Sequence, residues 1–351
     1  MRSILFTLIL TFLEITTVMA SPYKLTQEHQ LKALYPDEIA QHWQTGHFAN
    51  FTSFDNLTIE YALFISAEND QCIVLSPGRA EAYLKYKELA FDLHNQGYNV
   101  AIIDHRGQGL SSRELIDKHK GYVRDFNDYV LDFEQFVSKI VKPKCNSNMY
   151  VLAHSMGSAI AIRHMQQFPD TFAAASLSSP MIAVNGGDIP DWLGKPVVGV
   201  SHWVNDLFSE QSAYFYGYGP YKEKSFVGND LTQSKIRYQL FKQEYVNNPQ
   251  LQLGGVTFSW LQQAIANEAI IFADINKLTT PILVFQAEKD TVVSNVKQTL
   301  FCQQLHQLQP QSCPTGKPLV IKDALHELLF EGDDIRQQSL SAMLDWFNSH
   351  P

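Results

Sequence analysis

Three side chains that are far apart in the sequence could together make a serine reactive toward an ester carbonyl. Ser155 is the central residue of Ala153-His154-Ser155-Met156-Gly157, which lies between an apolar run and a helical pattern. A sharp turn from strand to helix exposes its central side chain and needs small neighbours, which explains the G-x-S-x-G pattern. Ala153 replaces the first glycine and is still small. The segment predicts Ser155 as a nucleophile, and the alternative is an ordinary serine that caps a helix.

A serine hydroxyl needs a base at neutral pH, and the base needs an acid that orients it. With this nucleophile turn, the order along the chain is Ser, acid, His. Asp290 follows a strand-like run that ends at Gln286, and we predict it as the acid, with Glu288 as its rival. His326 follows the last strand-like run, and we predict it as the base. His154 adjoins the nucleophile in sequence, but the turn should point it away.

Acyl transfer also needs hydrogen-bond donors for the oxyanion, and backbone amides near a helix N-terminus provide them without reorganising. One predicted donor is the backbone N–H of Met156, directly after the nucleophile. The other is the backbone N–H of Arg79, in the turn Pro77-Gly78-Arg79. The side chain of Arg79 is a separate question, because it could contact a phosphate group or only solvent.

The elements that must position these residues form a regular alternation. Short β-rich apolar runs alternate with amphipathic helical patterns, which predicts an α/β fold with a mostly parallel sheet covered by helices on both faces. The strand-like runs are 72–75, 99–103, 149–152, 173–177, 281–286 and 319–321. The helical patterns are 80–96, 124–141, 158–167, 294–306 and 333–348. Each of the three predicted catalytic residues lies just after one of the strands.

The alternation stops between residues 181 and 268. This segment contains three of the five Trp and no convincing strand–helix unit, so we predict a mainly helical cap inserted into one domain. The predicted division is a signal peptide 1–20, an N-terminal segment 21–47, a core of 48–180 and 269–351, and a cap (lid) 181–268. The aromatic cap would shelter an acyl chain, and the alternative is a cap whose aromatic residues only pack internally.

The first twenty residues have the layout of a secretory signal peptide. Arg2 precedes an apolar run from Ile4 to Leu13, and small or polar residues follow up to Ala20. This layout predicts export with cleavage near Ala20, to the periplasm or the medium, with or without membrane association. The alternative is an uncleaved N-terminal anchor.

Export would place the four cysteines in an oxidising compartment, where an even number suggests pairing. Four cysteines allow three connectivities. We predict Cys302–Cys313, which closes a short loop, and Cys72–Cys145, whose members lie at the starts of neighbouring strands. The alternative is four unpaired thiols.

The composition excludes several classes of protein. The chain has 351 residues, 45% of them apolar and 18% charged, so it is not a mostly disordered protein. Its net charge is −9 and its Lys and Arg are not clustered, which argues against nucleic-acid binding. The Gly-rich segment 104–109 lacks both the G-x-G-x-x-G frame and the lysine of a P-loop. We predict it as a turn in which Asp104 and Arg106 bond neighbouring loops.

Together these features resemble the branch of the α/β-hydrolases that contains bacterial lysophospholipases and monoacylglycerol lipases. The resemblance runs from about residue 50 to the C-terminus. Ser76-Pro77-Gly78-Arg79 stands where that branch usually has His-Gly. The segments that are similar to the lysophospholipase version are 98–111, 121–123 with Phe126 and Tyr129, 228–234, 237–238, 253–257 with Trp260, and 326–331.

The resemblance implies an α/β-hydrolase fold, a triad of Ser155, Asp290 and His326, and an oxyanion hole at Arg79 and Met156. It implies no metal and no organic cofactor. The implied activity is hydrolysis of the carboxylic ester of a single-chain lipid, first of all a lysophospholipid, with peripheral membrane contact through the cap. A monoacylglycerol lipase or a general carboxylesterase is the alternative, and a non-catalytic binding module of the same fold is a remote one.

Overall fold

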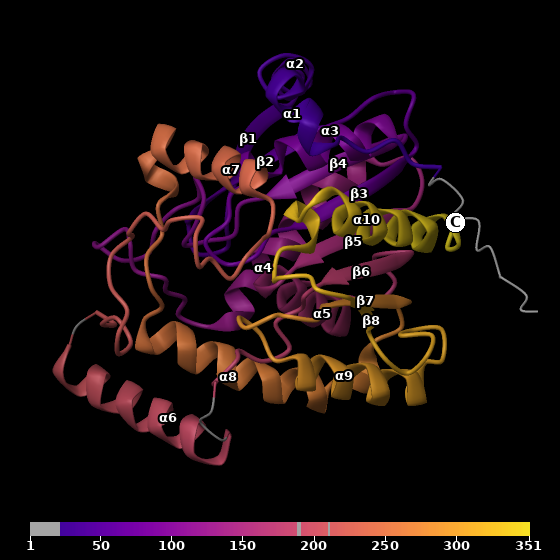
Figure 1. The fold of residues 1–351 in the computed structure, drawn as a ribbon. Helices are drawn as coiled ribbons and strands as arrows, with labels where there is room; N and C mark the ends of the chain where they lie inside the picture. Colours follow the sequence, from indigo (N-terminus) through magenta and orange to yellow (C-terminus); the bar gives the residue numbers. More distant parts are fainter. Residues whose placement is uncertain (1–21, 188–190, 210) are drawn as a thin grey trace, which may run out of the picture.

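The computed structural model describes residues 22–187, 191–209 and 211–351 (Figure 1). The predicted signal peptide lies outside the described residues. Within them, eight strands form one sheet in the order β1-β2-β4-β3-β5-β6-β7-β8. The strands are β1 His47–Thr52, β2 Thr58–Phe64, β3 Gln71–Ser76, β4 Tyr98–Ile103, β5 Met149–His154, β6 Ala174–Ser178, β7 Ile282–Ala287 and β8 Leu319–Ile321.

The sheet is parallel except at one edge. β1 pairs antiparallel with β2, and β2 pairs antiparallel with β4, whereas all pairs from β4 to β8 are parallel. Strands β4, β5 and β6 are buried along their whole length, as expected of parallel strands with helices on both faces. The predicted α/β class and mostly parallel sheet are confirmed.

Helices cover both faces of the sheet. The helices of the core are α3 Lys87–Asn95, α4 Phe126–Gln135, α5 Met156–Gln167, α9 Asn295–Leu308 and α10 Asp333–Asn348. Helices α3 and α10 pack on one face with Ile73 and Leu75, whereas α4, α5 and α9 pack on the other with Val74. This alternation along β3 follows from the two-residue period of a strand.

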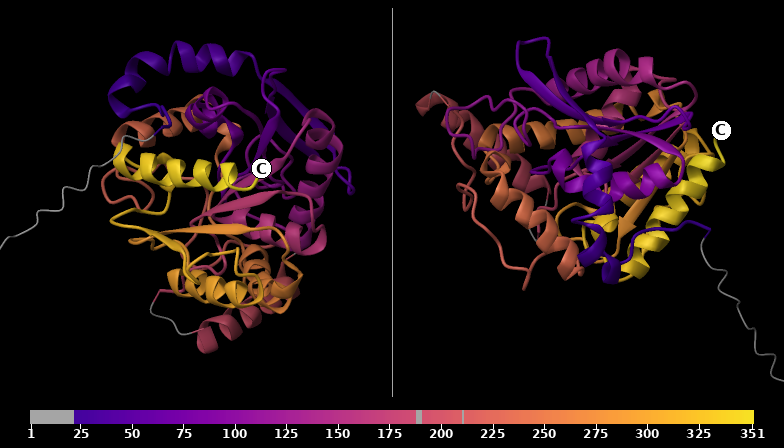
Figure 2. Two further views of the ribbon diagram at one scale, coloured as in Figure 1. Left: turned by 90° about the vertical axis from the view of Figure 1, so that its right-hand side faces the viewer. Right: turned by 90° about the horizontal axis from the view of Figure 1, so that it is seen from above.

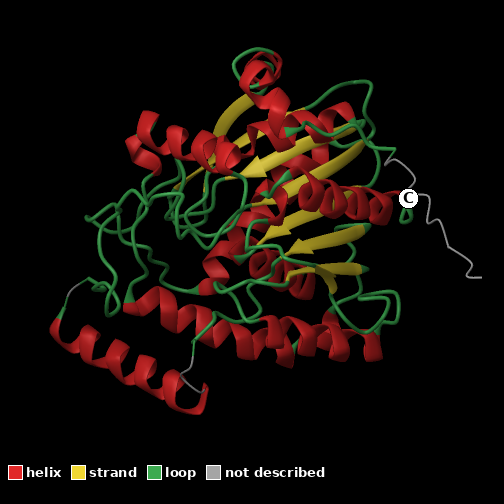
Figure 3. Cartoon of the chain, in the orientation of Figure 1, coloured by secondary structure: helices red, strands yellow, loops and turns green. Residues whose placement is uncertain are grey.

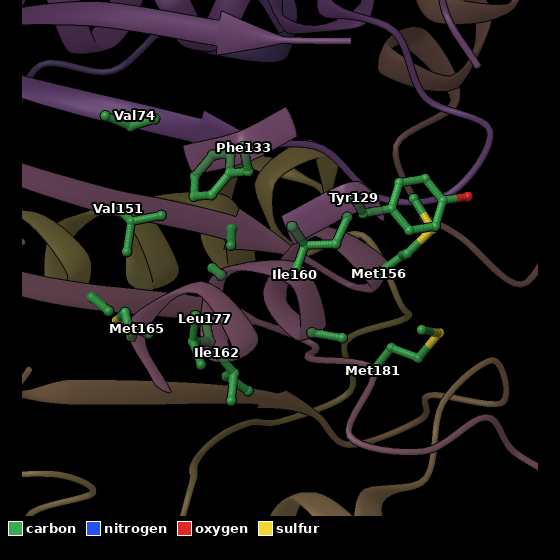
Figure 4. Close-up of a cluster of buried hydrophobic side chains, with 14 of the residues drawn as sticks. Val74, Tyr129, Phe133, Val151, Met156, Ile160, Ile162, Met165, Leu177 and Met181 are labelled. Carbon is green, nitrogen blue, oxygen red and sulfur yellow. The ribbon is translucent and has the colours of Figure 1, made fainter. Parts of the chain in front are cut away.

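The core face formed by α4 and α5 extends to the place where the strands end. In Figure 4, Val74 and Val151 lie along their strands, whereas Tyr129, Met156 and Met181 lie together beyond the strand ends. All five side chains belong to one buried cluster. The predicted nucleophile turn is therefore anchored in the main core through Met156.

The N-terminal part contains elements that the sequence analysis did not predict. They are the helices α1 Glu28–Leu34 and α2 Glu38–Gln44 and the hairpin formed by β1 and β2. The helix predicted over 80–96 is wrong at its start, because a 3-10 turn, Tyr83–Tyr86, precedes α3. Ala80 has φ 62° and Ala82 is extended, and neither conformation continues a helix.

The segment between β6 and β7 is mainly helical with long loops. It contains α6 Asp191–Phe208, α7 Lys235–Asn247, the short turn Pro249–Leu251 and α8 Phe258–Ala273, which continues beyond residue 268. The arrows of the parallel strands β3 to β8 in Figure 3 point toward the side where these loops gather. Helix α6 lies at the periphery beyond α8 in each view (Figures 1 and 2). No helix among the described residues has the length and apolar character needed to cross a bilayer.

Both predicted disulfides are present. Cys72–Cys145 ties β3 to the segment just before β5, across a sequence separation of 73 residues. Cys302–Cys313 ties α9 to the loop that follows it, across a separation of 11 residues. The alternative of four unpaired thiols is therefore excluded.

Candidate active site

Ser155 occupies the turn between β5 and α5, where the backbone is strained. Its φ is 51° and its ψ is −118°, a conformation that residues other than glycine rarely adopt. Gly157 allows this turn to sit close to β3, because a Cβ atom there would lie 2.0 Å from the carbonyl oxygen of Ser76. An ordinary N-cap serine has an extended conformation and bonds its own helix, and Ser155 does neither.

The three predicted catalytic side chains lie in one chain of contacts. His326 Nε2 lies 2.9 Å from Ser155 Oγ, and His326 Nδ1 lies 2.7 Å from Asp290 Oδ2. All three residues are buried. They come from the ends of three different strands, since Ser155 follows β5, Asp290 follows β7 and His326 follows β8. Asp290 can hold the imidazole with its Nδ1 protonated, so that Nε2 is free to take the serine proton.

The structure distinguishes Asp290 from its rival Glu288. The second carboxylate oxygen of Asp290 accepts hydrogen bonds from the backbone N–H groups of Val292 and Val293, at 2.8 and 3.1 Å. Glu288 is exposed, and its carboxylate accepts a hydrogen bond from the backbone N–H of Asp323. Only Asp290 contacts His326 among these two carboxylates.

The two backbone amides predicted for the oxyanion hole have no hydrogen-bond partner among the described residues. Their neighbours are bonded, because the N–H of Gly78 donates to Glu81 Oε2 and the N–H of Ala80 donates to Gln108 Oε1. The turn approaches the nucleophile closely, since a Cβ atom on Gly78 would lie 3.2 Å from the Cβ of Ser155. The N–H groups of Arg79 and Met156 are thus available beside Ser155.

The Gly-rich segment 104–109 holds the Arg79 turn in place. The Gln108 side-chain amide donates to the carbonyl oxygens of Gly78 and Glu81, at 2.7 and 3.1 Å. Asp104 accepts from the N–H groups of Tyr83 and Leu110, as the sequence analysis predicts for a residue that bonds neighbouring loops. Its burial raises the pKa of the Asp104 carboxyl to about 7.

Arg106 makes the second predicted set of contacts of this segment. Its guanidinium is completely buried and pairs with Asp132 at 2.7 Å and with Asp55 at 2.8 Å. These carboxylates lie on α4 and in the β1–β2 turn. The prediction that 104–109 is a structural turn and not a phosphate loop is consistent with these contacts.

A buried charged cluster beside the triad was missed by the sequence analysis. Lys85 Nζ lies 2.6 Å from Glu81 Oε1 and 2.6 Å from Glu327 Oε1. The other oxygen of Glu81 accepts from the phenol of Tyr86 at 2.6 Å and lies 3.2 Å from His154 Nδ1. Glu81 and Lys85 are four residues apart, a spacing that ordinarily indicates an exposed helical pair. The pair is instead buried.

His154 takes part in this cluster. We predict that its side chain points away from the nucleophile, and indeed its Nε2 approaches the carbonyl oxygen of His326, at 3.3 Å, and not the serine hydroxyl. Its ring centroid lies 4.8 Å from that of His326. Burial disfavours the charged imidazole, but the Glu81 carboxylate outweighs burial and raises the pKa of His154. The cluster therefore joins the nucleophile turn, the Arg79 turn and the His326 loop.

The segment between β6 and β7 supports the His326 loop from the other side. The N–H of Glu327 donates to the carbonyl oxygen of Leu231 at 2.8 Å, and Gln233 N donates to the Glu331 carboxylate at 2.8 Å. Arg237 on α7 donates to the carbonyl oxygen of Glu331 at 2.7 Å. The residues that carry the lysophospholipase resemblance in 228–238 thus fix the position of the loop that bears His326.

Comparison with known proteins places the chain in a family. A family model described as serine aminopeptidase, S33, matches residues 67–333. The chain belongs to this family. The S33 chain is 36% identical over 325 residues to lysophospholipase L2 of Escherichia coli strain K12, covering 93% of this chain and 94% of that protein. It is 32% identical over 296 residues to the probable lysophospholipase L2 of Haemophilus influenzae, covering 84% of this chain and 89% of that protein.

The fold of this S33 hydrolase is also found among solved structures. A soluble variant of monoglyceride lipase from Saccharomyces cerevisiae, in complex with a substrate analog, superposes with a TM-score of 0.64 at 17% identity. The match covers 87% of this chain and 97% of that chain. The S33 hydrolase is an enzyme with the α/β-hydrolase fold, and this confirms the predicted fold and the predicted class of activity.

Proposed function

We propose that this S33 hydrolase is a lysophospholipase in which Ser155, His326 and Asp290 carry out the ester cleavage. The observation that supports the proposal most directly is the contact chain from the Ser155 hydroxyl through His326 to Asp290. The full-length relatives of E. coli and H. influenzae are named lysophospholipases, which points to a single-chain phospholipid as the substrate.

In the proposed mechanism, Ser155 Oγ attacks the ester carbonyl carbon while His326 Nε2 takes the hydroxyl proton. Asp290 stabilises the imidazolium that forms. The N–H groups of Arg79 and Met156 donate to the oxyanion. Collapse of the tetrahedral intermediate breaks the ester bond, and His326 returns the proton to the departing glycerol alcohol. Water then attacks the acyl-serine with the same base and releases the fatty acid.

The test has a labelling arm and a substrate arm. We expect a fluorophosphonate to label the purified wild-type enzyme and Ser158→Ala, and to leave Ser155→Ala unlabelled; Ser158 is a buried serine three residues further along the chain. Equal labelling of Ser155→Ala would refute the nucleophile. Turnover of lysophosphatidylcholine and of monoolein is then compared. Hydrolysis of monoolein alone would favour a monoacylglycerol lipase, and hydrolysis of soluble short esters alone a general carboxylesterase.

We also propose that 181–268 is a cap that shelters the acyl chain and contacts a membrane surface through α6. The exposed apolar side chains of α6 recur at helical spacing, and Trp203 and Phe208 are 62% and 85% exposed. The others are Leu193, Val197, Val200, Val204 and Leu207. Such a patch matches a helix that lies in the interface of a bilayer.

Co-sedimentation with phosphatidylcholine vesicles tests this contact. We expect Trp203→Ser combined with Leu207→Ser to lower vesicle binding, whereas Ile116→Ser, which removes an exposed apolar side chain outside α6, leaves it unchanged. Equal binding of the α6 variant and the wild type would rule out the proposed contact.

The proposed location is outside the cytoplasm, after removal of residues 1–20. The support is the sequence layout of these residues together with the two disulfides, which persist in oxidising compartments. N-terminal sequencing of the mature protein tests the proposal. A mature chain that begins at Met1 would contradict cleavage near Ala20.

A further inference from the structure

The guanidinium of Arg79 lies beside the candidate active site, and no carboxylate among the described residues pairs with it. Its Nη2 donates to the carbonyl oxygen of Gly254 at 2.6 Å, and its Cζ lies 5.2 Å from the centroid of the Trp260 ring. Its Nε is buried and has no hydrogen-bond partner among the described residues. Most of its N–H groups are therefore unused.

The other buried arginines show what this chain ordinarily does with such a group. Arg106 pairs with Asp55 and Asp132, Arg163 with Asp274, Arg237 with Glu88 and Asp333, and Arg336 with Glu88 and Asp92. Burying a cation without a partner is costly, which is the reason for these pairs. Arg79 carries this cost, and burial lowers its pKa to about 10, so it is still charged at neutral pH.

The guanidinium is held in a fixed orientation. The cap-segment residues Gly254 and Trp260 contact it on two sides, and Gly121 leaves it space on a third, since a Cβ atom at Gly121 would lie 2.2 Å from Nη2. Arg79 as a whole residue is only partly buried, whereas its Nε is buried. A planar, oriented guanidinium with free N–H groups matches a phosphate oxygen pair.

We propose that the Arg79 side chain binds the phosphodiester anion of the lysophospholipid headgroup. This inference rests on the proposed function and adds the group that selects a phospholipid over an uncharged ester. In a lysophospholipid the glycerol unit alone separates the scissile ester from the phosphate. Arg79 therefore contacts both groups of the substrate: its backbone N–H donates to the oxyanion, and its side chain binds the phosphate.

The experiment measures kcat/KM for lysophosphatidylcholine and for a monoacylglycerol with the same acyl chain. Any disturbance of the Arg79 backbone lowers both values alike, so the readout is their ratio. We expect Arg79→Gln to lower the ratio of lysophosphatidylcholine to monoacylglycerol about 10- to 100-fold, the range of a charged hydrogen bond. Arg79→Lys keeps the positive charge but loses the planar pair of N–H donors, and we expect the ratio of the two kcat/KM values to fall about 3- to 10-fold.

Arg124→Gln is the matched control, because it makes the same change at an exposed guanidinium that pairs with Asp128. We expect Arg124→Gln to keep the wild-type ratio of kcat/KM for lysophosphatidylcholine to kcat/KM for the monoacylglycerol, because Arg124 is not part of the proposed phosphate subsite. An equal fall of the ratio in Arg124→Gln and Arg79→Gln would overturn the subsite, because bulk charge would explain both. An unchanged ratio in Arg79→Gln, with normal turnover of lysophospholipid, would overturn the subsite and leave the proposed function standing.

A second arm keeps the inference testable if the wild-type enzyme turns over no lysophospholipid, a result that would refute the proposed function. The assay follows hydrolysis of a soluble short ester and measures its inhibition by each of three compounds: dodecylphosphocholine, uncharged dodecyl maltoside and inorganic phosphate. We expect Arg79→Gln to weaken inhibition by dodecylphosphocholine about ten-fold or more relative to dodecyl maltoside. Equal weakening for both detergents would overturn the subsite. Inorganic phosphate that inhibits as well as dodecylphosphocholine, and only when Arg79 is present, would identify a free-anion site and overturn the headgroup assignment.

Discussion

Replacing Lys85 by methionine should destabilise the protein strongly and in a pH-dependent way. Lys85 Nζ contacts one oxygen each of Glu81 and Glu327, both at 2.6 Å, and all three side chains are buried. Methionine fills much of the same space between the rings of Phe241 and Phe330, which lie 4.6 and 4.4 Å from Nζ, so the cavity left behind is small. The loss is therefore mainly electrostatic, and removing one partner of a buried pair costs about 3–5 kcal/mol.

The pH dependence follows from the carboxyl group of Glu81. Burial raises its pKa, but the Lys85 ammonium and His154 outweigh burial and hold the pKa of Glu81 well below its ordinary value. This contribution stabilises the wild type above the ordinary carboxyl pKa and is lost as pH falls through the lowered value. Lys85→Met lacks the ammonium group, so burial disfavours the charged Glu81 carboxylate more strongly than in the wild type. Protonation of Glu81 therefore reduces the destabilisation of the variant. The difference between the two proteins should thus shrink between about pH 8 and about pH 5.

Urea unfolding followed by tryptophan fluorescence at the two pH values measures this difference. Lys289→Met is the control, because it breaks an ion pair with Asp323 in which both side chains are more than half exposed. We expect no measurable change in that control. A cost for Lys85→Met below about 1 kcal/mol, or one that is equal at both pH values, would refute the reasoning.

Further expectations concern the acid, the turn and the disulfides. Asp290→Asn should lower kcat/KM for a short ester about 10⁴-fold, whereas Glu288→Gln should change it less than about three-fold. Gly157→Ala should abolish esterase activity, because its Cβ would clash with the β3 backbone. In urea unfolding, removing Cys72–Cys145 should cost about 4 kcal/mol and removing Cys302–Cys313 about 3 kcal/mol, because the first closes the longer loop.

The candidate triad residues could be predicted from the sequence because each of them follows the end of a strand. A strand with helices on both faces is a continuous apolar run, so its end is visible, and the residue that follows is a candidate. Ser155 and Asp290 follow such runs, whereas His326 follows the short apolar run of the edge strand β8, in which only Ile321 is buried. The contact between them could not be predicted from the runs alone, because strand order is a tertiary property: β5, β7 and β8 lie near one another only through the pairing of β6 with both β5 and β7.

The Glu81–Lys85–Glu327 cluster could not be found in the same way. Two of its members lie in a stretch that was predicted as a helix, where charges four residues apart are usually solvated. Lys85 packs against the ring of Phe241 of α7, which lies more than 150 residues further along the chain. The early helices α1 and α2 were missed for a related reason, since each is seven residues long and buries only one side chain. So short a pattern carries little periodicity.

The two ends of the segment between β6 and β7 differ in how they are attached to the core. On α7, the buried Arg237 joins Glu88 of α3 to Asp333 at the start of α10. Removing this arginine would take the ion-pair partner from Asp333, whereas Glu88 would keep Arg336 at 3.4 Å. The neighbouring loop at Leu231 and Gln233 bonds the His326 loop directly. Because these contacts position a predicted catalytic residue, α7 cannot swing away without disturbing the triad. Helix α6 packs against α8 and exposes apolar side chains on its other side. Entry of a lipid should therefore involve α6 and leave α7 in place.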